Sequence, residues 1–112
     1  MSLILAKYVF TGPQPLKEFK ETDIEGLFGI FYLRYPEKKV ADYGVLYIGY
    51  TEEIKEQQGF PQSHKKFECW VNRGKGYENL YIGFCATPGI MPKQKEAILR
   101  YLVHKYNTIC NK

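Results

Sequence analysis

The β-sheet of this protein is predicted most clearly by two stretches: Leu27–Tyr35, which reads Leu-Phe-Gly-Ile-Phe-Tyr-Leu-Arg-Tyr, and Val45–Tyr50, which reads Val-Leu-Tyr-Ile-Gly-Tyr. Branched and aromatic side chains fit the pleated surface of a sheet, so each stretch is expected to be a strand. The polar segment Pro36–Lys39 directly follows the first stretch and is typical of a turn. We therefore expect an antiparallel hairpin with a long tip.

Further elements surround this hairpin in the sequence. We expect strands over residues 3–10 and 79–85, and helices over residues 52–58, 63–71 and 92–106. The last helix is the clearest of them because its apolar residues form one stripe at helical spacing: Ile98, Leu99, Leu102, Val103 and Tyr106. The segment Thr11–Pro15 contains a glycine and two prolines, so it is expected to interrupt regular structure.

The order of these elements predicts the fold class. We expect an α+β domain with a small, mainly antiparallel three-stranded sheet flanked by helices. Residues 26–112 are assigned to this domain and residues 1–25 to an N-terminal arm laid against it. A chain of 112 residues is long enough for one hydrophobic core.

Composition narrows the class of protein. A hydrophobic fraction of 45% and an aromatic fraction of 16% are typical of a globular protein rather than a disordered one. The net charge of +4 permits a polyanionic partner without requiring one. No uninterrupted apolar run is long enough to cross a bilayer, so we expect no membrane partner.

The cysteine pattern predicts reduced thiols. Cys69, Cys85 and Cys110 are odd in number, widely spaced and without a Cys-x-x-Cys pair. Neither a disulfide scaffold nor a zinc site is expected from this pattern. Because thiols stay reduced in the cytoplasm, we predict a cytoplasmic protein with inert cysteines.

Four segments together carry a resemblance to a known family. They are Gly29–Phe31, Tyr47–Gly49, Glu96 on the predicted last helix, and Tyr106–Asn111 near the end of the chain. In this order they resemble the GIY-YIG domain, a module of some homing endonucleases and of DNA-repair incision enzymes. The similarity extends over roughly residues 27–111.

This resemblance implies a metal-dependent phosphodiesterase site. Glu96 would hold a single Mg²⁺ or Mn²⁺ ion, which stabilises charge on the phosphate and lowers the pKa of bound water. Tyr47 would position the nucleophile and Asn111 would brace the site. His64, in a polar Ser-His-Lys-Lys run, is a candidate general base or phosphate contact.

Nucleic acid is the partner that the resemblance implies, with DNA as the expected class. Glycines beside a phosphate site let the backbone approach closely, and a basic surface with aromatic residues among the cations suits a polyanion. The candidate nucleic-acid-binding residues are Gly29, Gly49, Lys65, Lys66, Arg73 and Lys75.

Two residues depart from the family pattern. Phe31 ends the first motif where the family has tyrosine, so one catalytic hydroxyl is missing. Gln57 stands about where the family places arginine, and Lys55 or Lys66 is the candidate replacement cation. A lysine does not reproduce the planar fork of a guanidinium.

The sequence therefore leaves more than one function open. The first hypothesis is a divergent metal-dependent endonuclease that hydrolyses nucleic-acid phosphodiesters. The second is a catalytically inactive GIY-YIG-like domain that binds nucleic acid or a protein partner. A third is a small protein whose aromatic surface serves only homo-oligomerisation.

The candidate residues also have ordinary structural interpretations. Glu96 can pair with Arg100 four residues later on the same helix, as a solvated carboxylate. Tyr47 can be a strand residue packed on the core, and Trp70 is expected to be buried. A Glu96 held in such an ion pair, with Phe31 packed across the cleft, would favour the inactive domain.

Overall fold

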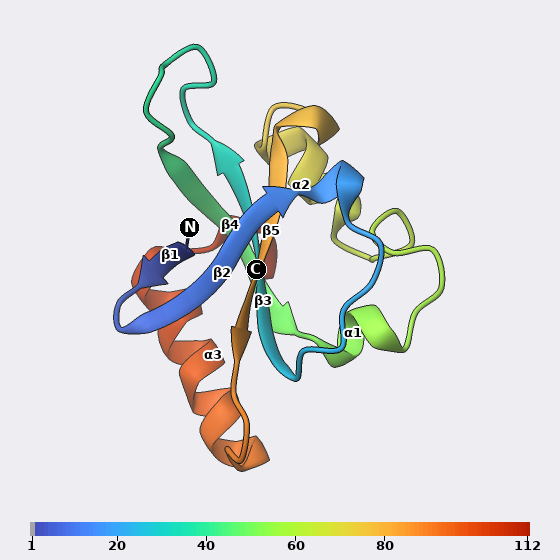
Figure 1. Ribbon diagram of the computed structural model, residues 1–112, viewed down its shortest axis with the longest axis vertical. Helices are drawn as coiled ribbons and strands as arrows, with labels where there is room; N and C mark the ends of the chain where they lie inside the picture. The colour runs from blue at the N-terminus through green and yellow to red at the C-terminus, as the bar shows by residue number, and fades with distance from the viewer. Residues whose placement is uncertain (1) are drawn as a thin grey trace.

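The computed structural model describes residues 2–112, which form a curled five-stranded antiparallel sheet with helices on both faces (Figure 1). The strands are β1 (Ser2–Leu5), β2 (Tyr8–Pro15), β3 (Gly26–Leu33), β4 (Tyr43–Tyr50) and β5 (Leu80–Ala86). The helices are α1 (Glu52–Lys55), α2 (Phe67–Arg73) and α3 (Pro92–Tyr106). Three 3₁₀ turns complete the described chain: η1 (Leu16–Glu18), η2 (Tyr77–Asn79) and η3 (Ile109–Asn111).

The prediction of a three-stranded sheet with a separate N-terminal arm is wrong. The sheet has the order β1-β2-β5-β3-β4, so the first fifteen residues supply two of its five strands. The chain reverses between Leu5 and Tyr8, where Ala6 adopts a φ of 57°. Alanine is not a typical residue for such a turn, so the sequence contains no hairpin signal there.

The proline-rich segment does not interrupt the sheet as expected. Strand β2 pairs with β5 on both sides of an irregularity between Thr11 and Gln14. Within this irregularity Gly12 has a φ of 90°, a conformation that glycine adopts at little cost. The bulge places two proline residues in a strand without breaking it.

The central strands are those that the sequence predicted. Strand β3 pairs with β4 on one side and with β5 on the other. The β3–β4 register shifts by one residue, so that Ile30 lies opposite Tyr47 and Phe31 lies opposite Val45. Leu46 is the extra residue, and it therefore lies with Tyr47 in the same hydrophobic core.

The sheet separates two hydrophobic cores. One contains Tyr47, Trp70 and Cys110 and is covered by α1, α2 and η3. The other contains Phe31 and Leu102 and is covered by α3, with β1 and β2 curling around it. Figure 1 shows α3 on one side of the central strands and α1 and α2 on the other. The two sides approach one another near α1, where Lys95 on α3 pairs with Glu52 at 3.0 Å.

Candidate functional site

The carboxylate of Glu53 on α1 connects three parts of the chain. Its Oε1 accepts a hydrogen bond from the Tyr47 hydroxyl at 2.7 Å and contacts His64 Nε2 at 2.8 Å. Its Oε2 accepts a hydrogen bond from the backbone N–H of Tyr50 at 2.8 Å. We call these residues (Tyr47, Glu53 and His64) the Glu53 cluster.

The contacts of His64 define its tautomer. Its Nδ1 accepts a hydrogen bond from the backbone N–H of Lys66 at 3.0 Å, so Nε2 carries the hydrogen that is donated to Glu53. The imidazole is only 2% exposed and stacks on the ring of Trp70 at a centroid distance of 4.6 Å. Both ring nitrogens are therefore occupied, and His64 has no free lone pair for a general base.

Tyr47 is equally unsuited to proton transfer. Burial raises the pKa of its phenol far above the usual range, and the hydrogen bond to Glu53 and the carboxylate charge raise it further. Burial also raises the pKa of Glu53, but the hydrogen bonds from His64, Tyr47 and the Tyr50 backbone outweigh it and lower that pKa below its usual range. The cluster thus consists of a neutral phenol, a neutral imidazole and an ionised carboxylate that holds both.

The two candidate phosphate-site glycines are covered by side chains. A Cβ on Gly49 would lie 2.7 Å from Glu53 Oε2 and 2.7 Å from the Tyr47 ring. A Cβ on Gly29 would lie 2.6 Å from the end of the Phe31 ring. Protein side chains fill the space beside both glycines. A phosphate would have to displace those side chains to reach the backbone.

The predicted metal ligand is not bound to this cluster. Glu96 is on α3, whose apolar residues pack on the opposite face of the sheet from Tyr47. Its Oε1 pairs with Arg100 Nη2 at 2.8 Å, and the two side chains are 54% and 74% exposed. Burial raises the pKa of Tyr50, the charges of Glu96, Glu53 and Glu52 raise it further, and Arg100 lowers it. Within residues 2–112 no group of three His, Cys, Asp or Glu side chains could hold a metal ion.

Phe31 and Gln57, which depart from the family pattern, and the candidate cation Lys55 all lie outside the Glu53 cluster. Phe31 is fully buried and packs edge-to-face against Phe10 at 6.0 Å. Lys55 and Gln57 line a surface pocket of about 320 Å³, and Lys55 Nζ donates a hydrogen bond to the carbonyl of Asp23 at 3.4 Å. Lys55 therefore extends toward the loop before β3 rather than toward the Glu53 cluster.

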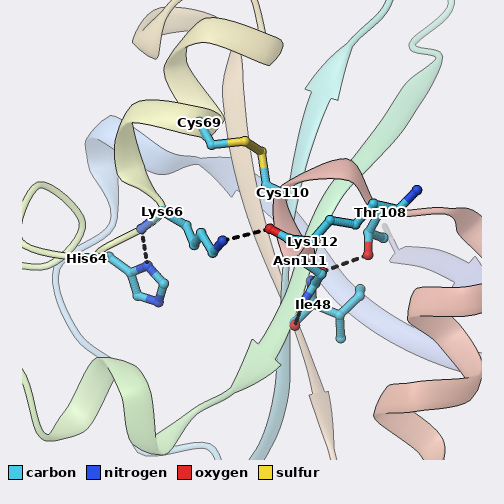
Figure 2. The surroundings of a disulfide bond; sticks show 8 residues. All are labelled: Ile48, His64, Lys66, Cys69, Thr108, Cys110, Asn111 and Lys112. Atoms are coloured by element: carbon cyan, nitrogen blue, oxygen red, sulfur yellow. Dashed lines mark hydrogen bonds between the residues drawn. A yellow bond between two sulfur atoms is a disulfide. The ribbon is translucent and has the colours of Figure 1, made fainter.

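Asn111 braces the edge of the sheet. Its Oδ1 accepts a hydrogen bond from the backbone N–H of Ile48 at 2.8 Å, and its Nδ2 donates to the Ile48 carbonyl at 2.9 Å (Figure 2). The Thr108 hydroxyl donates to the same Oδ1 at 2.7 Å. The amide side chain thus makes the pair of bonds that a neighbouring strand would make.

The prediction that all cysteines are reduced is wrong for one pair. Cys69 on α2 and Cys110 on η3 form a disulfide across a sequence separation of 41 residues (Figure 2). Cys85 is buried and unpaired within the described chain. Because the two bridged residues are far apart in sequence, their spacing alone could not indicate the pairing. The cytoplasmic localisation stays a prediction.

The candidate basic residues do not form one surface patch. Lys66 Nζ donates to the carbonyl of Lys112 at 3.0 Å, beside the disulfide. Lys75 Nζ donates instead to the carbonyl of Arg34 at 3.2 Å, at the base of the β3–β4 tip. Arg73 ends α2 close by in sequence, whereas Lys65 is exposed just before that helix begins.

Glu53 is the residue that sequence reasoning missed. Its place in the first turn of a helix suggested only an interaction with the helix dipole. The Tyr50 N–H donates to the side chain of a glutamate only three residues later, and that short spacing was available in the sequence. Its pairing with His64, eleven residues away, depends on the loop between α1 and α2.

No family model, curated protein or solved structure matches this chain. None of the helices within residues 2–112 is long and apolar enough to cross a membrane.

Proposed function

We propose that this protein is a catalytically inactive GIY-YIG-like domain that binds nucleic acid. The observation that carries the proposal is that each candidate catalytic group is already bound to another side chain of the protein. Glu96 is paired with Arg100 on the α3 face, while the Tyr47 hydroxyl is buried against Glu53 on the other face. A metal ion on Glu96 would have to compete with Arg100, and the Tyr47 hydroxyl would have to leave Glu53 before it could orient a nucleophile.

The proposed binding surface is the end of the molecule formed by the β3–β4 tip and the α2–β5 turn. Figure 1 shows both segments at the same end of the sheet. Asn79 connects them, because its Nδ2 donates to the carbonyls of Leu33 at 2.8 Å and Gly74 at 2.9 Å. The cations of this end are Arg34, Lys38, Lys39, Arg73 and Lys75, and its carboxylates are Glu37, Asp42 and Glu78. We call this surface the cationic end.

The chemistry of the cationic end suits a nucleic-acid backbone. Its cations outnumber its carboxylates, and neutralising phosphates releases counterions from a nucleic acid. Tyr35 is 44% exposed, with Lys38 Nζ 4.3 Å from its ring centroid, so an aromatic face and a cation are presented together. Bases stack on such aromatic side chains regardless of sequence. We therefore expect salt-dependent binding with little sequence preference.

The test of binding uses short fluorescent single-stranded DNA, duplex DNA and RNA, with anisotropy measured over a range of salt concentrations. The double variant Lys38→Glu/Lys39→Glu should weaken binding by about tenfold or more and reduce the salt slope by about two. The control Lys20→Glu/Lys93→Glu makes the same charge change at exposed sites elsewhere and should bind nearly as the wild type does. Equal weakening in both variants would contradict the cationic end, and no binding to any probe would contradict the function.

The test of inactivity is incubation of the same nucleic acids with Mg²⁺ or Mn²⁺. We expect no cleavage above a protein-free control. Metal-dependent cleavage by the wild type that is lost in Glu96→Ala would overturn the proposal and establish the endonuclease instead. Cleavage that survives in Glu96→Ala, and also in a separately purified preparation, would place a catalytic site elsewhere in the chain.

A further inference from the structure

The segment that follows α3 is attached to the domain by side-chain bonds. After Tyr106 the chain leaves the helix at Asn107, which has a left-handed φ of 49°. The next residues are held by the Cys69–Cys110 disulfide, by the two Asn111 bonds to Ile48 and by the bond from Lys66 to the Lys112 carbonyl. Figure 2 shows these attachments converging on η3.

The attachment at Ile48 covers an exposed sheet edge. Strand β4 is the last strand in the sheet order, so its outer backbone groups have no strand partner among the described residues. Asn111 satisfies both polar backbone groups of Ile48 with one side chain. Releasing η3 would return that N–H and carbonyl to solvent, which is a change that amide exchange detects.

The same segment is connected to the Glu53 cluster. Lys66 uses its side chain to hold the Lys112 carbonyl and its backbone N–H to hold His64 Nδ1, each at 3.0 Å. Cys69 follows on the first turn of α2. The disulfide, η3 and the N-terminal end of α2 therefore form one connected unit on this face of the sheet (Figure 2).

We propose that the Cys69–Cys110 disulfide is a redox latch that holds Asn111 on the edge of β4 and stabilises the Lys66–His64 contact. This inference goes beyond nucleic-acid binding and does not depend on it. In the oxidised protein the latch is closed, and in the reduced protein η3 separates from β4 while the sheet stays folded.

The chemical step is thiol–disulfide exchange with a dithiol reductant. Cys69 is partly exposed and Cys110 is 1% exposed, so the first thiolate of the reductant attacks the sulfur of Cys69. A sulfur–sulfur bond to Cys69 forms, the bond to Cys110 breaks, and Cys110 leaves as a thiolate that takes up a proton. The second thiolate of the reductant then attacks its own bridged sulfur, releasing Cys69 as a thiolate that is protonated. The reductant is oxidised to a disulfide and the protein gains two electrons and two protons.

The test is residue-resolved amide exchange by NMR on the whole protein, oxidised and then reduced with excess dithiol. Reduction should speed exchange at Ile48 and Lys66 by about tenfold or more beyond any change at Phe28 in the centre of the sheet, and reoxidation should reverse it. Equal exchange at Ile48 in the two states would overturn the latch. An equal rise in exchange at Phe28 and Ile48 would also overturn it, because the bond would then act only through the global stability of the fold.

Two variants make the result independent of the reductant. The pair Cys69→Ala/Cys110→Val should show the reduced pattern under oxidising conditions. Oxidised Asn111→Ala should speed exchange at Ile48 and leave Lys66 unchanged, because only the edge contact is removed. If the Cys69→Ala/Cys110→Val protein keeps the wild-type protection from amide exchange at Ile48, Asn111 stays in place without the disulfide. That result would contradict the proposal.

Discussion

Replacing Glu53 by glutamine tests whether the Glu53 cluster is a structural unit. The substitution keeps the size of the side chain and removes its charge. Its oxygen can still accept hydrogen bonds from Tyr47 and His64, but its NH₂ group then faces the backbone N–H of Tyr50, which is also a donor. Turning the amide around moves the conflict to the other two donors.

The cost follows from the hydrogen bonds that change. A buried donor left without a partner costs about 1–3 kcal/mol, and two remaining bonds lose the strengthening that an ionised acceptor provides. We expect Glu53→Gln to lower the free energy of unfolding by about 3 kcal/mol. Glu52→Gln is the matched control, because Glu52 is the preceding residue of α1 and its pair with Lys95 is 47% exposed on the glutamate side. That control should lose less than about 1 kcal/mol.

The assay is urea unfolding at neutral pH, followed by tryptophan fluorescence. Trp70 stacks on His64, so its emission reports the loss of this cluster directly. The slope of the unfolding free energy against urea should be the same in all three proteins, which shows that only stability has changed. If Glu53→Gln is no less stable than Glu52→Gln, the hydrogen bonds of Glu53 do not stabilise the fold and the reasoning is refuted.

Three further predictions concern the same side of the sheet. Because the pKa of Glu53 is lower in the folded protein than its ordinary value of 4.5, the unfolded chain binds more protons in acid. Stability should therefore fall as the pH drops below about 4.5, less steeply in Glu53→Gln, and acid titrations of unfolding that coincide for the two proteins would contradict this. Gly49→Ala should destabilise by about 1–3 kcal/mol, because its methyl group meets Glu53 and Tyr47, and a wild-type urea midpoint would count against the packing. Opening the Cys69–Cys110 bond, which closes a loop across 41 residues, should lower the unfolding free energy by about 4 kcal/mol or less, and urea curves that superimpose with and without dithiol would disprove it.

Local pattern was sufficient for the central elements of this fold. Aromatic and branched residues predicted β3, β4 and β5 to within about two residues, and the apolar stripe predicted α3 at Pro92–Tyr106. These elements are determined by residues that are close in sequence. The hairpin of β1 and β2 was missed because Ala6 gives no turn signal and the glycine and prolines of Thr11–Pro15 indicate a break, whereas pairing with β5 keeps that segment in the sheet.

The positions of the candidate site residues relative to one another depended on the tertiary structure to a larger extent. The sequence by itself supplied Tyr47, Glu96 and Asn111 in an order that suggests one site, and it identified the missing hydroxyl at Phe31. Only the folded chain decides on which face each side chain lies, because the strand alternation, the bulge at Leu46 and the docking of α3 act together. Contacts between residues distant in sequence, such as those of Glu53 with His64 and of Cys69 with Cys110, form only when the loops and the final turn are packed against the sheet.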